Sequence, residues 1–123
     1  TMTNHFQKIS LAALALAFAA QTLFAGFKPG DAAPDLASYK LEGKLPDDFK
    51  GKVIMLDFWA SWCGPCKAMA PQFERAAGRL EPGVRFAKIN TDEEQALASR
   101  FSIQGIPTLV LIKQGKEVAR QFN

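Results

Sequence analysis

The fold of this chain is decided by one stretch in its middle, VIMLDFWASWCGPCK, residues 53–67. Its first half, residues 53–60, is an apolar run of strand length, which is typical of a strand buried on both faces. Its second half holds the only two cysteines of the chain, Cys63 and Cys66. Apolar residues then recur at helical spacing. The cysteine pair is therefore predicted to lie where a buried strand turns into a helix.

A Cys-x-x-Cys pair at such a junction is typical of thiol–disulfide exchange. The free N–H groups and the positive dipole end of the helix start favour a thiolate at Cys63. Three alternatives are weaker. A structural zinc site needs about four ligands, and the only histidine is His5. A structural disulfide would close a very short loop, and two unrelated buried thiols are the third alternative.

Several separated segments of the chain resemble the thioredoxin family. Residues 57–67 resemble its active-site stretch, and Pro71 stands where the family helix has a kinking proline. Residues 87–92 resemble its central strand, and residues 101–108 resemble the segment with its cis-proline. The resemblance implies an α/β, thioredoxin-like fold, with a central mixed sheet flanked by helices.

The resemblance also implies roles for individual residues. Cys63 is expected to be the attacking thiolate and Cys66 the more buried resolving thiol. Asp57 stands inside an apolar strand and is expected to accept a proton from Cys66 through water; the alternative is a strand-end residue that faces solvent. Lys88 is expected to be the ion partner of Asp57 on the neighbouring strand, and the alternative is a surface lysine.

The Ile106–Pro107 peptide bond is expected to be cis and to face the cysteines, as in the family. Trp62 is expected to form an apolar docking lip with this loop, whereas Phe58 and Trp59 are expected to belong to the core. The expected substrate-binding residues are Trp62, Gly64, Pro65, Gly105, Ile106 and Pro107.

The rest of the body alternates strands and helices, as in a layered fold with a mixed sheet. Thr91 and Asp92 are expected to cap the second helix. In the family a last helix follows the final hairpin, and we expect that helix to be absent here, which would leave one face of the sheet partly bare. The expected elements are strand 53–60, helix 63–80, strand 84–89, helix 93–100, strand 107–113 and strand 117–122.

The two ends of the chain differ in character. Residues 1–25 hold an Ala/Leu run preceded by Lys8, which predicts a secretory signal peptide; the alternatives are an uncleaved membrane anchor and a helix docked on the body. Residues 26–49 are a turn-rich lead-in that resembles extracytoplasmic relatives, and residues 50–123 are the expected domain. We therefore expect a periplasmic or secreted protein, with membrane contact only through residues 1–25.

The formal charge of +3 comes from basic residues scattered among acids, without the basic clusters of a nucleic-acid binder. The resemblance implies a reductant of protein disulfides, supplied with electrons by an unidentified reductase and needing no cofactor or metal. Gly-Pro between the cysteines and Ile before the proline match reducing relatives. The competing hypotheses are an oxidant or isomerase of exported proteins and a non-catalytic binding module.

Overall fold

The computed structural model describes residues 30–43 and 51–122. Within these residues the centre is a five-stranded sheet of order β1-β3-β2-β4-β5. β2 and β3 are parallel, and the other neighbouring pairs are antiparallel, so the sheet is mixed, as expected. The strands are β1 Glu42–Gly43, β2 Val53–Trp59, β3 Val84–Asn90, β4 Thr108–Lys113 and β5 Lys116–Phe122.

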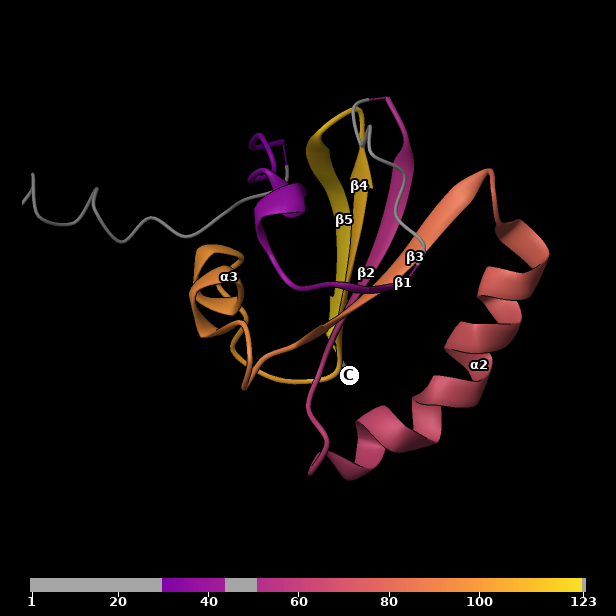
Figure 1. Cartoon of the computed structure of the whole chain (residues 1–123), viewed down its shortest axis with the longest axis vertical. Helices are drawn as coiled ribbons and strands as arrows, with labels where there is room; N and C mark the ends of the chain where they lie inside the picture. The colour runs from indigo at the N-terminus through magenta and orange to yellow at the C-terminus, as the bar shows by residue number, and fades with distance from the viewer. Residues whose placement is uncertain (1–29, 44–50, 123) are drawn as a thin grey trace, which may run out of the picture.

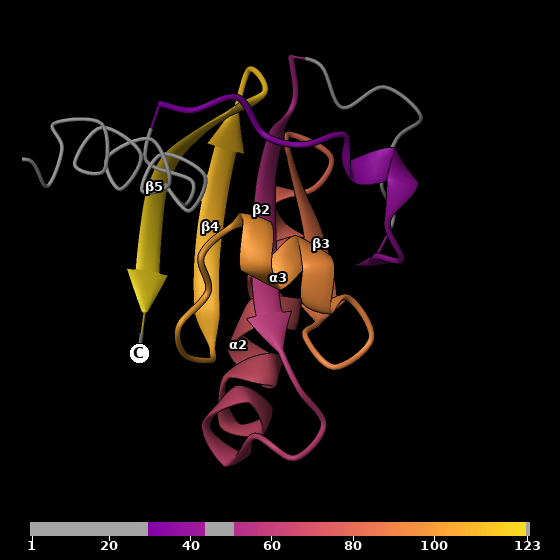
Figure 2. The ribbon, with the colours of Figure 1, turned by 90° about the vertical axis from the view of Figure 1, so that its left-hand side faces the viewer.

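Helices cover both faces of the sheet (Figure 1). The long helix α2, Gly64–Leu80, lies on one face. The short helix α3, Gln95–Arg100, lies on the other face together with the 3-10 turn η2, Leu36–Ser38. Seen from that second side, α3 crosses in front of β2 (Figure 2). The arrangement is a three-layer α/β sandwich.

The main core lies between the sheet and α3. Every second residue of β2 points to this side, because side chains alternate along a strand. Phe58 is fully buried, as expected for a core residue, and its ring centroid lies 5.3 Å from that of Phe101. The buried members of this core are Leu36, Ile54, Leu56, Phe58, Ala87, Ile89, Leu97, Phe101, Val110 and Ile112.

The described part of the lead-in belongs to this core. Leu36 is 3% exposed, and the Asp35 side chain caps η2 by accepting a hydrogen bond from the Ala37 N–H. Ala32 forms an antiparallel bridge with Lys116 at the outer edge of β5. Residues 30–43 therefore link the last hairpin to the α3 side of the sheet.

Three expectations about elements need correction or fall outside the structure. The second helix begins at Gln95, and neither Thr91 nor Asp92 caps it: its N-cap is Glu94, with no side-chain capping bond. The Asp92 carboxylate instead accepts a hydrogen bond from Trp62. The expectations for residues 1–25 lie outside the described residues.

The last described element is β5. On the face that carries α2, the β4 side chains Leu109 and Leu111 stay half-buried. None of the helices in the described ranges is long and apolar enough to cross a membrane.

Candidate active site

The two cysteines sit where β2 leads into α2, as the sequence predicts. Cys63 is the N-cap of α2, and its Sγ accepts a hydrogen bond from the Cys66 N–H at 3.2 Å. Pro65 occupies the first turn, where its missing N–H leaves no helical bond unmade. The helix start thus directs a backbone donor and its positive dipole end at the first sulfur.

Cys63 and Cys66 are joined by a disulfide. Both are buried in this oxidised form, with 4% of Cys63 and 2% of Cys66 exposed. The prediction that Cys63 is the attacking thiolate therefore rests on its capping position.

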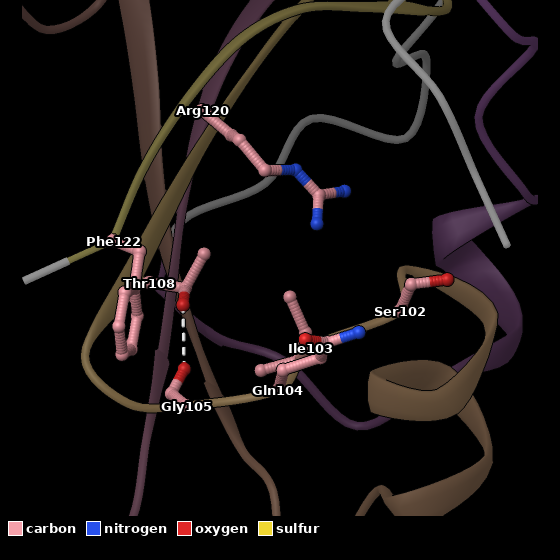
Figure 3. A pocket seen from close by; sticks show the side chains of 7 residues that line it. All are labelled: Ser102, Ile103, Gln104, Gly105, Thr108, Arg120 and Phe122. Atoms are coloured by element: carbon pink, nitrogen blue, oxygen red, sulfur yellow. Dashed lines mark hydrogen bonds between the residues drawn. The ribbon is translucent and has the colours of Figure 1, made fainter.

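The loop between α3 and β4 faces the first sulfur. Its Ile106–Pro107 peptide bond is cis, as expected. The Ile106 carbonyl oxygen lies 3.8 Å from Cys63 Sγ, close enough to accept a hydrogen bond from the reduced thiol. The hydroxyl of Thr108 donates to the Gly105 carbonyl at 2.5 Å and fixes the turn (Figure 3). The structure thus places the cysteines next to residues 101–107, the expected substrate loop.

Trp62 stands beside the pair and is 69% exposed. Its indole N–H donates a hydrogen bond to Asp92 Oδ2 at 2.9 Å. The hydrogen bond holds the ring in place although most of the side chain is exposed, which suits a docking residue. Asp92 belongs to the site and was missed by the sequence analysis, which assigned it to a helix cap.

Asp57 is buried on β2, with 1% of its surface exposed, so it does not face solvent. Neither carboxyl oxygen has a hydrogen-bond partner among the described residues. Removal from water raises the pKa of Asp57 to about 6, against a smaller opposing effect of the Lys88 charge. This carboxyl can therefore take up or release a proton near neutral pH.

Lys88 lies beside Asp57 in the register of the parallel β2–β3 pair, as expected for its neighbour. The expected direct ion pair is not formed within the described part of the chain. The Lys88 ammonium instead lies over the indole of Trp59, 4.4 Å from its ring centroid. Trp59 is half-buried and packs against the buried cluster of Ala60, Cys63 and Cys66, so it belongs to the core, as expected, and also borders the cysteines.

A cavity of about 510 Å³ is lined by part of the substrate loop, residues 102–105, together with Thr108 and two residues of β5 (Figure 3). The exposed ring of Phe122 forms one wall and covers Gly105, where an added Cβ would lie 2.1 Å from a ring carbon. Arg120 points into the cavity and is held from behind by two hydrogen bonds to the buried carboxylate of Glu117. The cavity lies next to the expected docking surface.

The remaining expected substrate-binding residues are Gly64, Pro65 and Pro107. Gly64 and Pro65 are exposed at the start of α2, and Pro107 is buried at the end of the loop, directly before β4. No group of three or more potential metal ligands occurs in residues 30–43 and 51–122. The site chemistry available in the described residues is that of two cysteines, one buried acid and one lysine.

Comparison with known proteins agrees with this geometry. The sequence profile described as Thioredoxin matches residues 40–123. A thioredoxin of Haemophilus influenzae is 48% identical over 68 residues, which are 55% of this chain and 64% of that protein. A thioredoxin-like protein of Synechocystis is 46% identical over 69 residues, 56% of this chain and 66% of that protein.

Solved structures give the same result. The thioredoxin of Fasciola hepatica matches with a TM-score of 0.56 and 46% identity, covering 58% of this chain and 68% of the other. A mutant thioredoxin of Halobacterium salinarum matches with a TM-score of 0.55 and 41% identity, covering 59% and 63%. This chain spans a little under two thirds of the length of the curated relatives described above.

Proposed function

Because this chain belongs to the thioredoxin family, we propose that it is a thiol–disulfide oxidoreductase that reduces disulfides in protein substrates. One observation carries the proposal. Cys63 caps α2: its sulfur accepts a hydrogen bond from the Cys66 N–H and lies 3.8 Å from the Ile106 carbonyl oxygen. A sulfur so placed is activated as a thiolate and stands beside a loop that can hold the substrate chain.

The reaction proceeds in two exchanges. The Cys63 thiolate attacks one sulfur of the substrate disulfide, forms a mixed disulfide and expels the other substrate sulfur as a thiolate. The Cys66 thiol gives up its proton, attacks Cys63 Sγ and releases the second substrate thiolate. Two electrons have then passed to the substrate, and the protein holds the Cys63–Cys66 disulfide seen in the structure.

Asp57 is the proposed acceptor of the Cys66 proton. Its raised pKa of about 6 supports the role, because an acid with this value can accept a proton near neutral pH and release it again. Trp62, Gly105 and Ile106 would contact the substrate around the reacting sulfur. The exposure of Trp62, its hydrogen bond to Asp92 and the hydrogen bond from Thr108 to Gly105 support a rigid docking surface.

Reduction of insulin disulfides tests the activity, with the reduction potential of the Cys63–Cys66 pair measured on the same protein. We expect a potential near the −270 mV of reducing thioredoxins rather than near about −120 mV, which marks a strong oxidant. A value at the oxidising end would favour the oxidant or isomerase. Ready reduction of insulin would exclude a non-catalytic binding module.

Two variants separate the roles of the cysteines. Cys66→Ser leaves the attacking thiolate without its resolving partner and should accumulate a mixed disulfide with substrate, detectable by mass spectrometry. Cys63→Ser should form none and should reduce no insulin. The proposal fails if both variants keep the activity of the unaltered protein.

We further propose that the protein works outside the cytoplasm, after residues 1–25 have directed its export or anchored it. The Lys8-led Ala/Leu run supports this location. A reductant there needs a membrane partner that supplies electrons, because the periplasm is kept oxidising. Fractionation of expressing bacteria tests the location: we expect the protein in the periplasm or membrane, and its recovery only from the cytosol would refute export.

A further inference from the structure

Lys88 has an acidic register partner on each neighbouring strand, Asp57 on β2 and Glu42 on β1, and it forms an ion pair with neither among the described residues. The β2–β3 register places Lys88 next to Asp57, and Trp59 follows two residues later on the same face. The ammonium lies 4.4 Å from the centre of the Trp59 ring. Neither oxygen of Asp57 has a partner among the described residues.

Burial explains why the indole is the partner. Lys88 and Trp59 are both half-buried, whereas Asp57 is 1% exposed. An ammonium over the ring face is attracted by the negative charge of the aromatic face while it keeps part of its hydration. A direct ion pair with Asp57 would draw the ammonium into the interior and remove more of its water, which opposes burial of the pair.

We propose that Trp59 is a positioning residue: its indole holds the Lys88 ammonium and so keeps the buried carboxyl of Asp57 free of a direct ion pair. The inference rests on the proposed function, in which Asp57 takes up the proton of Cys66. An acid locked in an ion pair stays a carboxylate and accepts protons poorly. Trp59 thus preserves the basicity of Asp57 although it forms no hydrogen bond with the Asp57 carboxyl.

Few other charges act on this acid. From β3 the facing group is Lys88, and from β4 the register neighbour is Leu109, which carries no charge. At the start of α2, Cys63 and Cys66 do not titrate while they form a disulfide, and the charged residues of α2 are exposed: Lys67, Glu74, Arg75 and Arg79. A titration of the oxidised protein therefore reports mainly on the position of Lys88.

The test weakens the attraction of the Trp59 ring for cations and leaves the shape of the ring nearly unchanged. The chain has two tryptophans, so in a Trp62→Phe background Trp59 can be replaced biosynthetically by tetrafluorinated tryptophan, whose ring face no longer attracts cations. The Asp57 carboxyl is then titrated by carbon-13 NMR in the oxidised full chain. We expect the titration midpoint to fall by about one pH unit, because Lys88 turns to the carboxylate.

Lys88→Met is the matched control. In this variant fluorination should leave the Asp57 midpoint unchanged, because no ammonium remains to move. An unchanged or higher midpoint on fluorination with Lys88 present would overturn the inference. So would an equal fall in the Lys88→Met protein, which would show that the fluorines act on Asp57 directly.

The titration also separates this inference from the proposed function, because it needs no thiol chemistry. If the midpoint falls as expected but the protein reduces no insulin, the positioning role stands and the proposed reductase fails. If the protein is a reductase, the acid limb of its pH–rate profile should move to lower pH on fluorination, together with the midpoint.

Discussion

The two sides of the site differ in how their polar atoms are satisfied. On the cysteine side, made of Cys63, Cys66 and Ile106, the first sulfur has a backbone donor and a carbonyl neighbour. On the acid side, made of Asp57, Lys88 and Trp59, the carboxyl has no hydrogen-bond partner and the ammonium lies on a ring. The contacts on the cysteine side thus favour one form of Cys63, the thiolate. On the acid side, the Asp57 carboxyl can still gain or lose a proton.

Burial therefore has a different effect on each side of the site. Contacts that fix the sulfur favour the thiolate and position it for attack. A buried acid without partners destabilises the folded protein when it ionises, and natural proteins retain such groups mainly at functional sites. The predictions below alter one side at a time.

The largest effect is expected on the acid side. The pKa of Asp57 rises from 3.8 to about 6 on folding, so the folded protein binds this proton more tightly than the unfolded chain. Stability linked to Asp57 is present below about pH 4 and is lost as the pH rises through about 6. Asp57→Asn should therefore stabilise the protein by about 3 kcal/mol at pH 7.5 and by almost nothing at pH 3.5.

Denaturant unfolding at the two pH values measures this difference. The same variant should slow insulin reduction by roughly a hundred-fold, because the proton acceptor is gone. Asp92→Asn changes an exposed acid in the same region and serves as the control for stability, because the Asp92 carboxylate keeps its contact with water in the folded protein. Lower stability of Asp57→Asn at both pH values would contradict the desolvation argument.

The second prediction concerns the cysteine side. The helix start should lower the pKa of Cys63 below the ordinary value of about 8.5, while Cys66 has no such position. Iodoacetamide at pH 7 should therefore alkylate Cys63 of the reduced protein at least about tenfold faster than Cys66. Peptide mapping gives the two rates, and faster labelling of Cys66 would reverse their roles.

A smaller effect is expected where the docking surface meets the cysteine side. Trp62→Phe removes the hydrogen bond to Asp92, which should cost about 1 kcal/mol in substrate binding because the ring is no longer fixed. The KM for a protein substrate should rise about fivefold while kcat stays nearly constant. Trp62→His, which keeps a ring N–H, is the comparison variant, and an unchanged KM in the Phe variant would exclude Trp62 from docking.

The sequence predicted the cysteine side better than the acid side, for a physical reason. The Cys63–Cys66 pair and its helix start depend on local chain geometry, and the cis Ile106–Pro107 bond was implied by the resemblance to the family, which rests on motifs with fixed spacing. Such features are visible along the sequence. The predicted strands and the first helix likewise agree with the structure to within one or two residues.

The missed features depend on contacts across the sheet. Trp59 looks like a core residue in an apolar strand, and only the β2–β3 register places Lys88 near its ring. Asp92 looks like a helix cap, and only the fold brings it to Trp62. The cis Glu81–Pro82 bond likewise had no signal, because most X-Pro bonds are trans.

The smallest effect is expected where Gly105 of the substrate loop meets the Phe122 ring. A Cβ added at Gly105 would lie 2.1 and 2.4 Å from two carbons of the Phe122 ring, so one of the two must move. The ring is 65% exposed and can swing outward, whereas the turn is held by the Thr108 hydroxyl on the Gly105 carbonyl. Gly105→Ala should therefore cost less than about 1 kcal/mol of stability.

Insulin reduction sharpens this last prediction. If the ring yields and the loop stays, Gly105→Ala should lower kcat/KM by no more than about twofold, and adding Phe122→Ala should change nothing further. A tenfold or larger fall in kcat/KM of Gly105→Ala, reversed by adding Phe122→Ala, would show instead that the loop had moved. That outcome would mean that Phe122 is packed more firmly than its exposure indicates, and that the cysteine side depends on β5 for its geometry.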